Sequence, residues 1–374
     1  MHNELLLVGS IPMETAEQVF RVFGRELGEW LAYLPDGEVG DRRYWIDGIA
    51  YRVLNGHPEI ETLKRPAPDE DGVEQWRPKG THDEFQFRVK PGVSKVRFGD
   101  LGWRFGYTRD AVNSYAIFRL LKKDGVIPQH VRFQVCLPLT YSAVTSFFPD
   151  PDDHARIVPG TNEALRAEVK KMVELIPAKE LAIQWDLAVE NRYLEPKLLE
   201  GTDVARREAR RLLEPASEIC SVIPGDVALG YHICFGTLNG WPSRQPPTLA
   251  GSVLMANASV EASNRRVDFI HIPTVGSCSD EFFAPLESLR TGDARIYIGA
   301  IHHMHDDRGL RHQLTIVKKH LNEFGIAAPC GFGRAPERPG RLLTNDGSKP
   351  PDYVEIILKD HRAAADVLRS LRTN

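Results

Sequence analysis

His232 and Cys234 lie two residues apart in the strand-like run "GYHICFG" at 230–236, and Cys330 follows a later apolar run, "GIAAPCGFG" at 325–333. Residues two apart on a strand point to the same side, so both side chains of the first pair can face one point. Imidazole and thiolate ligands favour zinc over magnesium or calcium, and three protein ligands leave a fourth position open. We therefore expect a Zn²⁺ site here; the alternative is that the two thiols are buried as small apolar side chains.

A second group of histidines lies in "HHMHDD" at 302–307. His302 ends an apolar run, and an imidazole titrates near neutrality, so His302 is a candidate for proton transfer. His303 and His305 form an H-x-H pair of the kind found on the first strand of amidohydrolase barrels. Here the pair follows the seventh run, so we expect loop residues or substrate contacts.

Acidic side chains follow two further runs. Asp186 ends "LAIQWDL" at 181–187, and a lone buried carboxylate is costly without a partner. We expect Asp186 either to meet a basic group such as Arg42 or Arg334, or to bind a substrate amine. Glu38 and Arg42 lie in "LPDGEVGDRRYW" at 34–45, which is either a solvated turn or part of the site.

Short apolar runs alternate along the chain with amphipathic helical patterns, which is typical of α/β proteins. Eight such runs predict a (β/α)8 TIM barrel, in which the chemistry lies at the C-terminal ends of the strands. A doubly wound open sheet is the alternative, but no G-x-G-x-x-G follows the first run. Helices are expected over 161–177, 308–325 and 361–373. The eight runs are 4–10, 30–38, 130–138, 181–187, 227–234, 267–273, 294–302 and 325–333.

The alternation breaks between about 54 and 115, where a polar, proline-rich stretch precedes one or two extra strand-like runs. We interpret 1–374 as a single barrel domain and 54–115 as an insertion after the second strand, forming a lid or side wall.

The composition excludes several classes of partner. The 374 residues are 42% hydrophobic and 26% charged, with a net charge of -4, so neither nucleic acid nor an anionic membrane is expected to bind. No apolar run approaches the ~20 residues of a membrane span. Five scattered cysteines favour a reduced, cytoplasmic protein over a disulfide framework. A small-molecule substrate is expected, and a homo-oligomer is compatible with the sequence.

Six short motifs in order resemble the catalytic domain of cobalamin-independent methionine synthase, in the uroporphyrinogen decarboxylase/methionine synthase-like superfamily. The family pattern has I-G-S-F-P, G-E, Q-x-D-E-P, H-x-C, D-I-H and C-G-x-x-x-R. The resemblance implies that His232, Cys234 and Cys330 bind zinc. It also implies that Ser10, Glu38 and Asp186 line an amino-acid or thiol pocket, and that His302 handles a proton. The motifs here read "VGSIP", "DGE", "IQWD", "HIC", "AIH" and "CGFGR".

Two departures from this family affect the expected activity. The family's fourth zinc ligand is a glutamate at the end of strand six, where this chain has Pro273; His271 lies two residues earlier and could substitute. The family's D-E-P is "DLA" here, which puts contacts to a folate donor in doubt. We expect a zinc-dependent methyl or alkyl transferase acting through a zinc-bound thiolate, and not methionine synthase itself.

Two other functions stay open. One is a lyase, decarboxylase or hydrolase acting on a carboxylated or phenolic substrate, with Arg42, Asp186 and the histidines at the barrel mouth. The other is a non-catalytic barrel that binds a metabolite, although binding alone rarely needs so many titratable groups.

Overall fold

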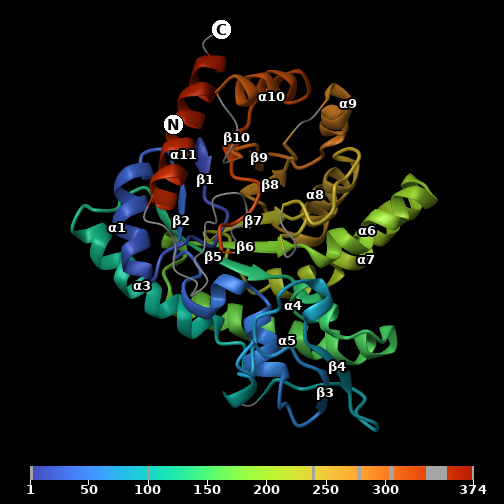
Figure 1. Cartoon of the computed structure of the whole chain (residues 1–374). Coiled ribbons are helices and arrows are strands. Elements are labelled where there is room, and N and C mark those ends of the chain that lie inside the picture. Colours follow the sequence, from blue (N-terminus) through green and yellow to red (C-terminus); the bar gives the residue numbers. More distant parts are fainter. Residues whose placement is uncertain are drawn as a thin grey trace.

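A parallel sheet of eight strands forms the centre of the molecule, in the order β1-β10-β9-β8-β7-β6-β5-β2. A parallel bridge between Leu5 and Leu31 brings the first and last strands of this order together. Helices surround the sheet (Figure 1), and the expected (β/α)8 TIM barrel is confirmed. The computed structural model describes residues 3–99, 101–237, 241–276, 279–302, 307–333 and 352–372.

The eight predicted runs each contain one strand of the barrel. The strands are β1 Leu5–Leu6, β2 Tyr33–Pro35, β5 Arg132–Pro138, β6 Leu181–Leu187, β7 Ala228–Ile233, β8 Phe269–Pro273, β9 Arg295–Gly299 and β10 Gly325–Ala327.

The helices that follow the strands vary widely in length. They are α1 Ala16–Leu27, α2 Asp47–Ile49, α3 Tyr107–Lys123, α4 Thr140–Val144, α5 Pro151–Leu175, α6 Val189–Glu200, α7 Thr202–Cys220, α8 Ala250–Ser263, α9 Asp280–Phe283, α10 Asp307–His320 and α11 Asp352–Arg372.

Local sequence explains the first β/α unit. Thr15 caps α1: its side chain accepts a hydrogen bond from the Gln18 amide, while the Gln18 side chain accepts one from the Thr15 amide. Phe20 and Phe23, three residues apart, are fully buried on the side of α1 that faces the sheet. The strands themselves are buried on both faces, as every residue of β6 illustrates.

The last helix, α11, forms ion pairs with the residue that precedes the first strand. Glu4, which precedes β1, is 3% exposed and forms ion pairs with Arg369 at 2.9 Å and Arg372 at 3.1 Å, both on α11. In Figure 1, α11 lies beside α1 and β1. A buried carboxylate is stable when two guanidinium groups pair with it, so these contacts hold the first strand in the sheet.

The segment between β2 and α3 carries a two-stranded antiparallel sheet of β3 Ile60–Lys64 and β4 Gln86–Val89. It contacts the outside of α5 through main-chain groups: the amide of Val96 donates to the Arg156 carbonyl at 2.9 Å. The amide of Val89 donates to the Asp153 carboxylate at 3.1 Å.

Helix α5 begins ten residues before the expected start at 161, and it contains Pro159.

Gly160 of α5 lies against the backbone of the insertion. A Cβ at this position would lie 1.9 Å from the carbonyl oxygen of Val96. We expect Gly160→Ala to lower the free energy of unfolding by about 1–3 kcal/mol, because the two backbones would have to separate. Urea unfolding of this variant against Gly225→Ala measures the effect, because at Gly225 no atom lies within 4 Å of an added Cβ and the backbone is not left-handed. A loss of stability at 160 no larger than that at 225 would contradict this contact.

Within the described parts of the chain, no helix combines the length and the apolar character that crossing a membrane requires. The expectations for His303, His305 and Arg334 fall outside the described residues.

Candidate metal centre and substrate pocket

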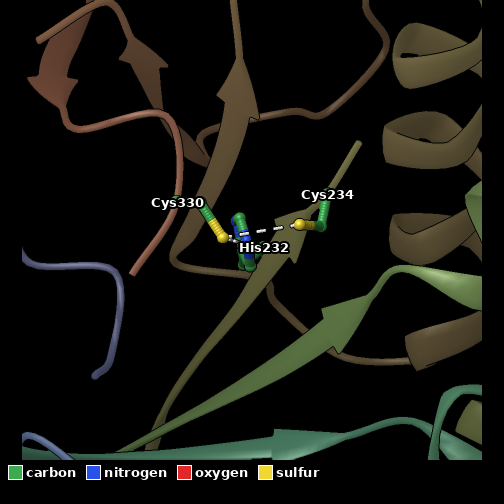
Figure 2. Close-up of side chains that lie close together, drawn as sticks. All are labelled: His232, Cys234 and Cys330. Atoms are coloured by element: carbon green, nitrogen blue, oxygen red, sulfur yellow. Dashed lines mark hydrogen bonds between the residues drawn. The ribbon is translucent and has the colours of Figure 1, made fainter. Parts of the chain in front are cut away.

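Three potential soft ligands meet at the C-terminal end of the barrel (Figure 2). His232 lies on β7, Cys234 directly follows that strand, and Cys330 follows β10. The Cys234 and Cys330 sulfurs are 3.5 Å apart, and the Cys330 sulfur is 3.8 Å from His232 Nε2. One donor atom from each residue lies within 4.8 Å of the other two. Strand alternation sets His232 and Cys234 on one side of the chain, and closure of the barrel brings Cys330, almost one hundred positions later, beside them.

The contact between the two thiols shifts their pKa values in opposite directions. Contact with the Cys330 thiol, together with His232, lowers the pKa of Cys234 well below its usual range. The same contact and burial raise the pKa of Cys330. The amide of Gly236 also donates to the Cys234 sulfur at 3.3 Å. Cys234 is thus the sulfur that the protein stabilises as a thiolate.

His271 lies next to this group, because β7 and β8 pair in a register that sets His271 beside His232. The two Nδ1 atoms are 2.7 Å apart, and His271 Nε2 is 2.9 Å from the Ala328 carbonyl oxygen. Both ring nitrogens of His271 thus have protein partners. The cluster of three ligand-type residues does not include it.

A cavity of about 80 Å³ opens beside the cysteines. Its walls come from the ends of β1, β2, β6, β7 and β10 and the loops that follow them. The lining residues are Val8, Gly9, Ser10, Glu38, Arg43, Trp45, Asp186, Ala188, His232, Cys234, Gly236, Thr237, Cys330 and Gly331.

Two carboxylates, Glu38 and Asp186, line the cavity. Asp186 accepts a hydrogen bond from Gln184 Nε2 at 2.9 Å. Burial and then the negative charge of Glu38 raise the pKa of Asp186 well above its usual value. A cation placed between the two carboxylates would relieve this unfavourable interaction.

Arg42 does not reach Asp186 in an ion pair. It binds Asp36 at 2.8 Å and lies 3.6 Å from Asp110. Burial would raise the pKa of Asp36, but the Arg42 charge and hydrogen bond outweigh burial and lower it. Arg42 thus braces the loop after β2, and its neighbour Arg43 lines the cavity instead.

Besides the expected Glu38, the loop after β2 contributes Arg43 and Trp45, which the sequence did not assign to the site. Glu38 and Trp45 both line the cavity and both have positive φ, 48° and 57°. Such backbone conformations are strained for residues with a side chain and cluster at functional sites. A loop sequence does not reveal which side chains point inward, so Arg43 and Trp45 carried no signal beyond their place next to Arg42.

Ser10 and His302 have different surroundings. Ser10 lines the cavity, and its Oγ accepts a hydrogen bond from the Gly333 amide at 3.0 Å. His302 is not among the lining residues; its Nε2 is 3.2 Å from Thr274 Oγ1, and its side chain is buried. The proton-handling role of His302 remains a prediction.

Glu190, near the start of α6, is a fully buried carboxyl group at the same end of the barrel. Its carboxylate accepts hydrogen bonds from the backbone amide and the hydroxyl of Ser142. The Ser142 Oγ also accepts hydrogen bonds from the backbone amides of Ala188 and Val189. Burial raises the pKa of Glu190 from 4.5 to about 7. Ionisation therefore opposes folding, and stability should fall as pH rises from about 4.5 to 7 and stay low above it.

We expect Glu190→Gln to remove this pH dependence and to gain up to ~3 kcal/mol relative to the wild type between pH 5 and pH 8. The amide oxygen of glutamine still accepts from Ser142, so the fold is retained. Urea unfolding at both pH values measures the difference, with the exposed Glu163→Gln as control. A wild type whose advantage over the variant grows with pH would show that the ionised form is the stabilising one.

Comparison with known proteins gives structural likeness only. No family model and no curated protein sequence matches the chain. A B12-independent methionine synthase from Shewanella sp. W3-18-1, solved with selenomethionine, aligns with a TM-score of 0.54 at 14% identity, covering 95% of this chain and 88% of that one.

A Listeria monocytogenes protein, provisionally assigned as a vitamin-B12-independent methionine synthase, aligns with a TM-score of 0.52 at 13% identity, covering 95% and 86%. At such identities the likeness is one of fold: this chain is similar in architecture to the barrels of B12-independent methionine synthases.

Proposed function

We propose that this protein is a zinc-dependent methyl or alkyl transferase that acts on the sulfur of a small thiol. The observation that carries the proposal is the convergence of His232, Cys234 and Cys330 on the wall of a cavity at the C-terminal end of the barrel. This is the end at which TIM-barrel enzymes carry their active sites.

The donor set suits zinc. One imidazole nitrogen and two sulfurs lie close enough to bind a single ion, and thiolates select zinc over hard cations. Three ligands from the chain would leave one coordination position for a substrate sulfur. When bound, zinc supplies a positive charge that stabilises the thiolate form of a substrate thiol at neutral pH, and the thiolate is the nucleophile.

The remaining lining residues favour an amino acid that carries the thiol. Glu38 and Asp186 provide negative charge for an ammonium group, and Arg43 provides positive charge for a carboxylate. The Shewanella structure holds selenomethionine, an amino acid with an alkylated selenium in place of sulfur, which supports this choice. The alkyl donor would reach the substrate sulfur through the open side of the cavity.

The test uses purified full-length protein. We expect about one zinc per chain by elemental analysis. After replacement of zinc by Co²⁺, homocysteine should increase the sulfur-to-cobalt charge-transfer absorbance, because a third thiolate joins the two from the chain. Homoserine, which has a hydroxyl in place of the thiol, is the matched control and should leave the band unchanged. Protein that binds neither metal, or a band that ignores homocysteine, would contradict the proposal.

A further inference from the structure

The contacts of His271 define which of its nitrogens carries a proton. The Ala328 carbonyl oxygen, 2.9 Å from His271 Nε2, can only accept a hydrogen bond, so Nε2 must donate. His271 is fully buried, and a charged imidazolium without a carboxylate partner is costly at such a position. A neutral ring with its proton on Nε2 has a bare Nδ1.

This bare nitrogen decides the state of the neighbouring ring. His271 Nδ1 lies 2.7 Å from His232 Nδ1, a distance that requires one of the two atoms to donate. Because His271 Nδ1 has no proton, His232 Nδ1 donates. The opposite nitrogen of His232, Nε2, then has a free lone pair, and it is the nitrogen nearest the Cys330 sulfur, at 3.8 Å.

The packing leaves the His271 ring little freedom to turn. A Cβ at residue 299, on the adjacent strand β9, would lie 2.7 Å from His271 Nε2 and 2.9 Å from the Cα atoms of Pro273 and Pro329. The absence of a side chain at Gly299 thus makes the space that the ring fills. Ala328 belongs to the chain just after β10, so β8, β9 and this segment together set the orientation of the ring.

We infer that His271 is a positioning residue that holds His232 in its Nδ1-protonated tautomer and so aims the Nε2 lone pair at the metal position. A chain of polar groups running from the Ala328 carbonyl through His271 to His232 replaces the carboxylate or carbonyl that commonly orients a metal-binding histidine. The inference rests on the proposed zinc site, but it assigns His271 to a position behind a ligand and not to the ligand set.

Two variants separate orientation from ligation. His271→Leu fills similar space without an acceptor, and His271→Asn sets an amide oxygen near the former Nδ1. Zinc affinity is measured by competition with a chromophoric chelator, after circular dichroism has verified the fold. We expect the Leu variant to bind zinc 10–100-fold more weakly and the Asn variant to regain most of that loss. Equal losses in both variants, or no loss in either, would overturn the inference.

A second measurement does not depend on any variant folding or on metal. In ¹⁵N-histidine-labelled, metal-free wild type, two-bond ¹⁵N–¹H spectra distinguish the ring tautomers. We expect His271 to carry its proton on Nε2 and His232 on Nδ1; a proton on His271 Nδ1 would refute the inference even if zinc binds tightly. A protein that shows the expected tautomers but never binds zinc would refute the proposed function alone.

Discussion

Replacing Cys234 and Cys330 together with serine is expected to reduce bound zinc from about one per chain to near zero and to abolish alkyl transfer. Serine hydroxyls stay protonated at neutral pH and are poor ligands for zinc, so one imidazole would remain of the three donors. The expected loss of zinc is nearly complete because the two sulfurs, 3.5 Å apart, would bind the same ion.

The matched control is Cys220→Ser. Cys220 is a buried cysteine at the end of α7, 3.7 Å from the Tyr231 hydroxyl, and a serine there can keep that contact. It should retain zinc and activity. Elemental analysis and circular dichroism of both proteins decide the result; a double variant with full zinc content, correctly folded, would place the metal elsewhere.

The second large effect is expected from Asp186→Asn. Removing one charged partner of a substrate ammonium costs about 1.5–3 kcal/mol, which is about 10–100-fold in the affinity for an amino-acid thiol. Isothermal titration with homocysteine and with 4-mercaptobutyrate, which keeps the thiol and carboxylate but lacks the amine, separates this role from a general one. Only homocysteine should lose affinity.

Glu190→Gln is the appropriate control for Asp186→Asn. It also neutralises a buried carboxyl group at this end of the barrel, but Glu190 does not line the cavity. Its affinity for both thiols should match the wild type. If Asp186→Asn lowers the affinity for both thiols equally, the carboxylate maintains the pocket but does not bind the amine.

The barrel could be predicted because its strands are buried on both faces. The run 181–187 is apolar apart from Gln184 and Asp186, and β6 occupies the whole of it. The cluster of His232, Cys234 and Cys330 could also be predicted in part, because residues 232 and 234 share a side of one strand. The start of α5 could not: Pro159 suggests a boundary, but the helix runs from Pro151 past it.

The orientation of His271 depends on interstrand register, which local patterns do not contain. Its place on an apolar strand made it a candidate ligand, but pairing with β7 and a nearby carbonyl engage both its nitrogens. Arg42 likewise had the right charge for Asp186, but Asp36 lies closer and pairs with it. Both cases show competition between neighbours that only three-dimensional packing decides.

Helix α5 lies between the barrel sheet and the insertion, and this arrangement limits how copies of the chain could associate. Its outward side chains Asp153 and Glu168 accept main-chain amides of the insertion, from Val89, Gly106 and Thr108. That side of the helix ring is therefore already occupied within one molecule. A twofold contact between two copies at this part of α5 would therefore have to involve the outer surface of the insertion.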